Sequence, residues 1–237
     1  MSKTKNILIT GASSGIGKEI ASLLSKDKNY NLFLSGRRKL ELENYFSCNL
    51  SSANEAKNLV IEAQKYFNSS IDILINCAGQ YIYKPIDKMN LDEIDNLINL
   101  NFKSSYILSA LVIDDMKKNN WGRIVNIGSI SGMVGEANAT LYSATKSALG
   151  GLTKALALEV AHNNITVNQI NPGWVKTALV DNSLTEEDKQ EVLDVTPQGR
   201  FIEPIEIAKL CEYLISDNAK GLTGQNINLC AGLSIGC

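Results

Sequence analysis

Short, continuous runs of apolar residues alternate along the chain with longer segments in which apolar residues recur every three or four positions. The runs predict seven strands, at residues 6–10, 30–35, 45–50, 71–77, 123–129, 165–171 and 226–230. Several of them, such as IDILINC and GRIVNIGS, are apolar at nearly every position. That pattern is typical of strands buried on both faces of a parallel sheet.

The longer segments predict helices at residues 15–26, 52–67, 91–118, 140–162 and 204–216. The alternation indicates an α/β fold with a doubly wound parallel sheet of about seven strands and helices on both faces. No linker rich in Pro, Gly or Ser interrupts it, so we expect residues 1–237 to form a single domain. Residues 177–196 are polar, have only a weak helical pattern and have no place in the sheet, so we expect a substrate flap there.

Composition narrows the classes of protein to consider. The chain has 237 residues, 44% of them apolar, and a net charge of −2, so a full core is possible and the charge gives no reason to expect nucleic acid as a partner. The apolar run at residues 7–9 is too short for a secretory signal, and no run is long enough to span a membrane. Five scattered cysteines without a CxxC pair, and one histidine, predict neither a disulfide framework nor a metal site. We expect a cytoplasmic protein without a membrane partner.

A glycine-rich turn, TGASSGIG at residues 10–17, joins the first predicted strand to the first predicted helix. Glycine in such a turn lets backbone N–H groups approach a pyrophosphate at a helix N-terminus, where the helix dipole favours an anion. The alternative is that the glycines serve only the turn. A P-loop is excluded, because Ala12 and Glu19 stand where it needs a glycine and a hydroxyl. The turn predicts these dinucleotide contacts: Gly11, Ser13, Ser14, Gly15, Ile16 and Gly17.

The second predicted strand ends in two arginines, Arg37 and Arg38, directly after Gly36. Dinucleotide sites that prefer NAD have an acid near this position to bind the ribose 2′-hydroxyl, whereas a basic residue suits the 2′-phosphate of NADP. The arginines therefore predict NADP(H) as cofactor. The alternative is a solvated basic turn.

Tyr142 and Lys146 lie four residues apart in a predicted helix, so they share one face of it. A nearby cation lowers the pKa of a phenol, which suits tyrosine to act as a general acid or base near neutral pH. Ser129 ends a predicted strand thirteen residues earlier, at the sheet edge where ligands bind in such folds. Its hydroxyl either binds a substrate carbonyl oxygen or caps the next turn, and both readings stay open.

Together these residues resemble the short-chain dehydrogenase/reductase family, which has a Rossmann-type fold and uses NAD(P). The resemblance covers essentially the whole chain, and GRIVNIGS and PQGR favour its 3-oxoacyl-acyl-carrier-protein reductase group. It is carried by these segments: TGASSGIG, NCAG, NLNFKSS, IGS, YSATK, NPGWVKT, PQGRFIEPIEIA and GQNINLCAG.

The resemblance implies a role for each candidate catalytic residue. Tyr142 would donate the proton in carbonyl reduction, and Lys146 would bind the nicotinamide ribose and lower the tyrosine pKa. Ser129 would orient the substrate carbonyl, and Asn101 would support a water chain behind Lys146. Further cofactor contacts would be Asn49, Leu50, Asn76, Ala78, Gly79, Pro172, Gly173, Val175 and Thr177. Further substrate contacts would be Tyr81, Ser131 and Trp174.

Two departures from the family pattern stand out. About a dozen residues separate Arg37 from Leu50, which leaves room for only a very short second helix and opens the adenine edge. Cys77 replaces a usual asparagine, and we interpret it as a small packed residue rather than a nucleophile. The implied function is NADP(H)-dependent reduction of a carbonyl, most simply a 3-oxoacyl group carried on acyl carrier protein. The alternatives are another ketone, a sugar or a steroid as substrate, or a regulator without enzymatic activity.

Two segments bear on partners. Residues 144–160 are apolar or small nearly all the way round, and the helix before them has surplus apolar residues, so we expect a homotetramer. Acyl carrier protein is acidic, so basic side chains are expected near the mouth of the site. We expect them just before GRIVNIGS and just after the helix of Tyr142, where the chain reads Asn120-Trp121 and Asn163-Asn164, with Lys117 and Lys118 a turn earlier.

Overall fold

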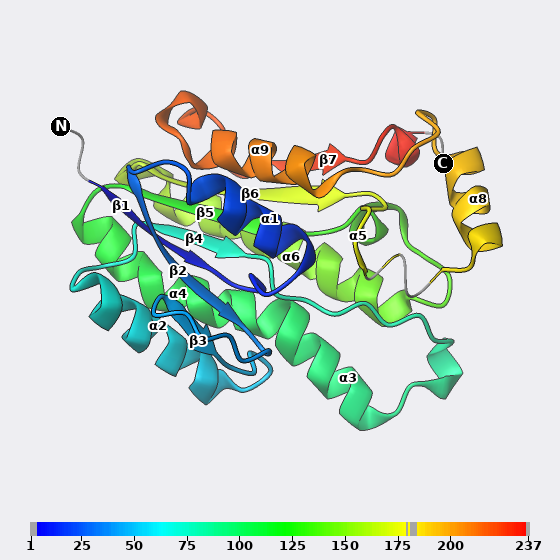
Figure 1. Cartoon of the computed structure of the whole chain (residues 1–237), viewed down its shortest axis with the longest axis horizontal. Coiled ribbons are helices and arrows are strands. Elements are labelled where there is room, and N and C mark those ends of the chain that lie inside the picture. The colour runs from blue at the N-terminus through cyan, green and yellow to red at the C-terminus, as the bar shows by residue number, and fades with distance from the viewer. Residues whose placement is uncertain (1–3, 179, 181–183, 236–237) are drawn as a thin grey trace.

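Seven parallel strands form one sheet in the order β3-β2-β1-β4-β5-β6-β7 (Figure 1). The computed structural model describes residues 4–178, 180 and 184–235. The expected doubly wound α/β fold is confirmed, with every neighbouring pair of strands parallel. The strands are β1 Lys5–Ile9, β2 Tyr30–Gly36, β3 Tyr45–Ser47, β4 Ile73–Asn76, β5 Gly122–Ile127, β6 Ile165–Pro172 and β7 Asn226–Leu229.

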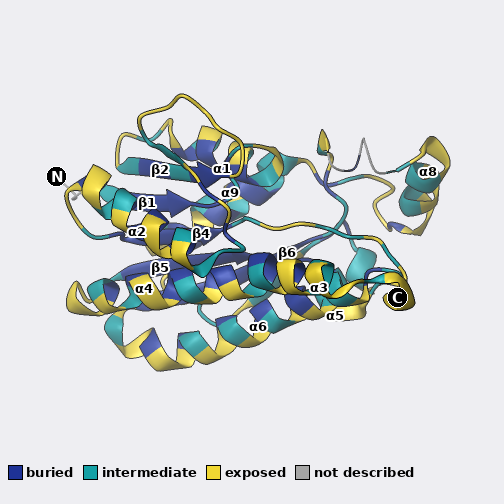
Figure 2. Cartoon of the chain, turned by 90° about the horizontal axis from the view of Figure 1, so that it is seen from below, coloured by how far each residue is buried: buried dark blue, intermediate teal, exposed yellow. Residues whose placement is uncertain are grey.

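Helices cover both faces of this sheet, and the alternation of side chains along each strand supplies a core to each layer. In β1, Ile7 and Ile9 pack with helices α1 (Gly15–Leu24) and α9 (Pro204–Ile215), whereas Leu8 packs with α2, α4 and α6. The central strands are buried and the outer helix faces exposed in Figure 2. The remaining long helices are α2 Ala53–Phe67, α3 Leu91–Ile98, α4 Ser104–Lys118 and α6 Thr140–Val160.

The helix expected over residues 91–118 is present but interrupted. A π-helical turn, Asn99–Lys103, separates α3 from α4. The extra residue of a π turn breaks the regular hydrogen-bond ladder and re-aims the side chains within it, which occurs most often at functional sites. Asn101 lies in this turn.

The prediction of a very short helix after Arg37 is wrong, because residues 37–44 contain no helix. Residues 37–43 are exposed, so this connection has no buried face with which to stabilise a helical turn. β3 is also shorter than expected and ends at Ser47.

The segment expected to be a substrate flap contains a helix in its described part. α8, Glu186–Val195, begins with a capping box between Thr185 and Asp188 and has no buried residue. It stands beyond the end of the sheet toward which the strands point (Figure 1). Part of the segment, residues 179 and 181–183, lies outside the described residues.

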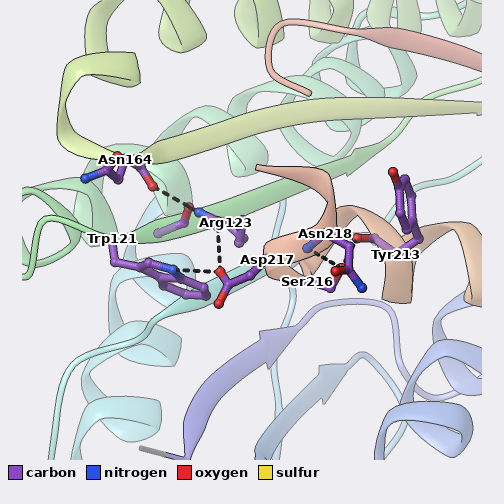
Figure 3. A network of polar contacts seen from close by, with 8 residues as sticks. Trp121, Arg123, Asn164, Tyr213, Ser216, Asp217 and Asn218 are labelled. Atoms are coloured by element: carbon purple, nitrogen blue, oxygen red, sulfur yellow. Dashed lines mark hydrogen bonds and ion pairs between the residues drawn. The ribbon is translucent and has the colours of Figure 1, made fainter. Parts of the chain in front are cut away.

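A polar network fixes the opposite end of the sheet (Figure 3). Arg123 at the start of β5 is 2% exposed and donates hydrogen bonds to the carbonyl of Asn164 and to Asp217, which follows α9. Its guanidinium also lies over the Trp121 ring, which has the Lys5 ammonium 3.6 Å from its centre. The indole N–H of Trp121 also donates a hydrogen bond to Asp217. The network joins the start of β5 to the layer of α9, far from the carboxyl ends of the strands.

Within the described residues, no helix has both the length and the apolar character that crossing a bilayer requires.

Candidate active site

The glycine-rich turn between β1 and α1 leaves little space for side chains. Gly11 and Gly15 have φ angles of +69° and +53°, which favour glycine. A Cβ on Gly17 would lie 2.4 Å from the carbonyl oxygen of Gly11, so the turn closes only with glycine there. Ser14 precedes α1 without a side-chain hydrogen bond to the helix, and the first turn contains no acid. The positive end of α1 is therefore open to an anion, as a bound pyrophosphate requires.

The neighbouring strand β4 supports this turn. The Thr10 hydroxyl oxygen accepts hydrogen bonds from the backbone N–H groups of Cys77 and Ala78, each 3.0 Å away. Asn76 behaves differently, because it is 3% exposed and its side chain donates to Asn126 inside the sheet. The Asn76 side chain therefore joins two strands inside the sheet, whereas Gly79 is exposed to solvent.

The adenine edge is open and basic. Arg37 and Arg38 are exposed, and neither has an ion-pair partner in the part of the chain that the structure describes. Asn49 is exposed, but its side-chain oxygen already accepts two hydrogen bonds from Ser51. The side chain of Leu50 is buried in the core with α2, so only its backbone faces this edge. Two guanidinium groups without an ion pair to any described residue suit a phosphate here.

At the carboxyl end of β5, Ser129 lies beside the phenol of Tyr142, which projects from the start of α6. The Ser129 oxygen accepts a hydrogen bond from the Ser131 backbone N–H at 3.1 Å. Burial raises the pKa of Tyr142 to about 12, although a hydrogen bond with Ser129 opposes that shift. The phenol is therefore protonated at neutral pH, as a proton donor must be.

Lys146 lies behind the tyrosine and is 5% exposed. Its ammonium donates a 2.8 Å hydrogen bond to the carbonyl of Ile127 and lies 5.7 Å from the centre of the Tyr142 ring. Burial lowers the pKa of Lys146 to about 8. Burial of the phenol dominates the pKa of Tyr142 here, and the ammonium donates to Ile127, so the expected lowering of the tyrosine pKa by this lysine stays a prediction.

Asn101 is fully buried in the π-helical turn and holds the chain that follows β4. Its side-chain oxygen accepts from the backbone N–H of Gln80, and its amide donates to the Gln80 carbonyl. A Cβ on Gly79 would lie 3.3 Å from the Lys146 nitrogen and 3.4 Å from the Asn101 oxygen. Asn101 and Lys146 thus flank the same glycine, and the π turn gives Asn101 its position.

One pocket of 310 Å³ opens over these groups. Tyr81 forms its aromatic wall, with its ring centre 5.0 Å from that of Tyr142 and 6.3 Å from that of Trp174. Two of the expected catalytic residues, Ser129 and Tyr142, line this pocket together with the expected nicotinamide-site residues, whereas Asn101 and Lys146 are not among its lining residues. Among its lining residues are Ile16, Tyr81, Ser129, Ser131, Tyr142, Pro172, Gly173, Trp174, Val175 and Thr177.

Comparison with known proteins decides the family. The model of the short chain dehydrogenase family matches residues 5–188. The chain belongs to this family. A 3-oxoacyl-acyl-carrier-protein reductase of Rickettsia felis is 36% identical over 97% of this chain and 96% of that protein. The enzyme of that name from Staphylococcus aureus is 33% identical over 98% and 99%. The aldohexose dehydrogenase of Thermoplasma acidophilum, in its ligand-free form, has a TM-score of 0.90 at 28% identity and covers 98% of this chain and 95% of that one.

This short-chain dehydrogenase also has a pocket residue that the motifs did not indicate. Glu136, which lies between Ser129 and Tyr142 in the sequence, lines the pocket. Its carboxylate accepts hydrogen bonds from the hydroxyls of Tyr81 and Ser131. The available signal was an acid between the two catalytic positions, in a segment otherwise without charge.

The expectation that Lys117 and Lys118 border the mouth of the site is wrong for a single chain. Both lie at the end of α4, which leads into the start of β5, whereas the pocket lies at the carboxyl end of that strand. The 6-residue strand separates the two places, since a strand rises about 3.3 Å per residue.

Proposed function

We propose that this protein is an NADP(H)-dependent 3-oxoacyl-acyl-carrier-protein reductase. The observation that carries the proposal is the meeting of the Ser129 and Tyr142 hydroxyls in one pocket, with the Lys146 ammonium buried behind them. The relatives of that name match nearly the whole chain and support this choice of substrate.

The dinucleotide would lie along the carboxyl ends of the strands. The open N-terminus of α1 and its glycine turn fit the pyrophosphate, and Thr177 faces that turn, with its methyl 3.6 Å from where a Cβ on Gly15 would be. Arg37 and Arg38 would bind the 2′-phosphate, and residues 172–177 would line the nicotinamide site. When bound, the reduced cofactor supplies the hydride.

The chain's own groups would orient the carbonyl and supply the proton. Ser129 would donate a hydrogen bond to the substrate oxygen, and Tyr142 would give its phenol proton to the same oxygen. Lys146 would bind the ribose hydroxyls and keep a positive charge near the phenolate that forms. Asn101 would hold the chain at Gln80 so that this lysine stays in place.

The shape of the pocket bears on the substrate. Its lining is largely apolar, with three aromatic residues beside Ile130, Val134, Val180, Val195 and Leu233. Such a lining suits an acyl chain better than a sugar. The likeness to an aldohexose dehydrogenase, together with the hydrogen-bonding carboxylate of Glu136, favours sugar oxidation as the second candidate.

We also propose a cytoplasmic homotetramer. Exposed apolar side chains on α4 and α6, such as Tyr106 and Leu158, are available for a two-fold contact. An antiparallel pairing of α4 with its copy would bring the Lys117–Lys118 end of one chain toward the site of the other. That arrangement would let an acidic carrier protein dock on two subunits. Four free thiols among the described residues are in keeping with a reducing compartment.

A turnover assay separates the candidates. Purified protein is mixed with NADPH and an acetoacetyl thioester, and in a parallel reaction with NADP and an aldohexose. We expect NADPH consumption with the thioester and little reaction with the sugar. Turnover of the sugar alone would favour the second candidate and overturn the first.

A further inference from the structure

Glu136 is the one charged side chain among the described residues that line the pocket. It is half-buried and has no ion-pair partner among the described residues. The rest of the lining is apolar, aromatic or hydroxyl-bearing. A half-buried carboxylate acts more strongly on a charge that enters the pocket than one in bulk water does, because protein replaces part of the water around it.

Two hydroxyl groups hold this carboxylate in place. Tyr81 donates to one oxygen at 2.5 Å, and Ser131 donates to the other at 2.7 Å. Both partners donate, which matches an ionised acid that can only accept. The Glu136 charge also raises the pKa of Tyr81 and contributes to raising that of Tyr142, after the larger effect of burial on each.

The carboxylate is close to the reacting centre. Ser131, which donates to Glu136, accepts a hydrogen bond from the Ser129 hydroxyl at 3.1 Å. Two hydrogen bonds, through Ser131, therefore connect Glu136 to the Ser129 hydroxyl, which is proposed to bind the substrate carbonyl. A negative charge on the substrate beside its carbonyl would therefore lie in the same pocket as the Glu136 carboxylate.

We propose that Glu136 determines charge selectivity: the pocket accepts 3-oxo substrates whose acyl group is a neutral ester or thioester and rejects free 3-oxo acids. This inference rests on the proposed reductase function and narrows its substrate class. A free 3-oxo acid carries its carboxylate two carbons from the reacting carbonyl, so repulsion acts on it directly. The thioester has the same carbon skeleton without the charge. Rejection of a close analogue by repulsion is a common basis of specificity.

The test compares methyl acetoacetate with acetoacetate at neutral pH, two substrates that differ by one charge and one methyl group. The measured quantity is the ratio of their kcat/KM values with NADPH, because a general change in catalysis cancels in that ratio. The variants are Glu136→Gln, which removes the charge, and Glu136→Asp, which keeps it. Glu62→Gln on the exposed face of α2 serves as the matched control, and thermal unfolding checks that each variant is folded.

We expect the wild type to prefer the ester and Glu136→Gln to reduce that preference about tenfold, mainly by improving turnover of acetoacetate. Glu136→Asp and Glu62→Gln should keep the wild-type ratio. An unchanged ratio in a folded Glu136→Gln variant, while the ester is still reduced, would overturn the inference and leave the proposed function intact. If the wild type reduces neither compound and no 3-oxo thioester, the proposed function fails and the inference with it.

Discussion

Lys146 and Tyr142 lie on one face of α6, with the ammonium nitrogen 5.7 Å from the centre of the phenol ring. The hydrogen bond from that nitrogen to the Ile127 carbonyl joins the helix to the end of β5. Lys146 is buried and Tyr142 half-buried, and their pKa values shift in opposite directions, because removal from water disfavours the charged form of each. At neutral pH the pair therefore holds one neutral phenol and one ammonium.

These shifts predict how cofactor affinity depends on pH. The pKa of Lys146 is about 8, so its side chain is positively charged below that pH and loses the charge as the pH rises through 8. The pKa of Tyr142 is about 12, so the phenol does not change over this range. We expect the affinity for NADPH, measured by its fluorescence between pH 7 and pH 9, to fall as the pH rises through 8. Lys146→Arg keeps its charge and should move the fall to higher pH. A fall at the same pH in that variant would assign it to another group.

Arg37 is expected to determine the preference for NADPH over NADH. A charge-assisted hydrogen bond to the 2′-phosphate contributes roughly 1.5–3 kcal/mol, so Arg37→Ala should weaken NADPH binding at least about tenfold. The affinity for NADH should change little. Lys39→Ala, two residues further along the same exposed connection, is the matched control. Equal loss of affinity for both cofactors would show that Arg37 does not act through the phosphate.

The Arg123 network predicts that replacing Arg123 lowers the free energy of unfolding more than replacing Asp217 does. Arg123→Ala removes a buried side chain that donates to Asn164 and Asp217 and stacks on Trp121, so we expect a loss of about 2–3 kcal/mol. Asp217→Asn should cost less than about 1 kcal/mol, because the Asp217 side chain is 79% exposed and asparagine keeps an acceptor. Urea unfolding measures both. Equal costs would contradict this account of the network.

Leu158 on α6 is 83% exposed and lies on the face proposed to meet a second copy. Leu158→Glu should reduce the oligomer seen by light scattering, because a charge would be buried in the contact. Ile61→Glu on α2, which is 57% exposed outside that face, should leave the oligomer unchanged. A wild-type monomer at micromolar concentration would contradict the tetramer directly.

Much of the fold could be predicted because β4 and β5 are continuous apolar runs and the glycine turn follows directly on β1. The interruption at Asn101 could not, since a π turn arises from how two helices meet and leaves no periodic signal. The helix before residues 144–160 is expected to have surplus apolar surface, but three of its apolar residues, Leu108, Val112 and Met116 of α4, belong to the core instead. Sequence spacing does not show which side of a helix faces the sheet when both sides are apolar.

The site shows the same limit. Ser129, Tyr142 and Lys146 could be placed together from strand ends and helix spacing, because those rules fix local geometry. Glu136 was missed because its importance depends on two hydroxyls, from Tyr81 and Ser131, that only the folded chain brings to it.

The most direct test of the proposed chemistry is the turnover of Tyr142→Phe with NADPH and a short 3-oxoacyl thioester. Phenylalanine keeps the ring and removes the proton, and acid catalysis contributes about 10²–10⁴-fold, so kcat should fall by that factor. The affinity for NADPH, measured on the same preparation, should stay within about twofold of the wild type, because the ring and Lys146 remain. A Tyr142→Phe variant that reduces the thioester at the wild-type rate would contradict the account.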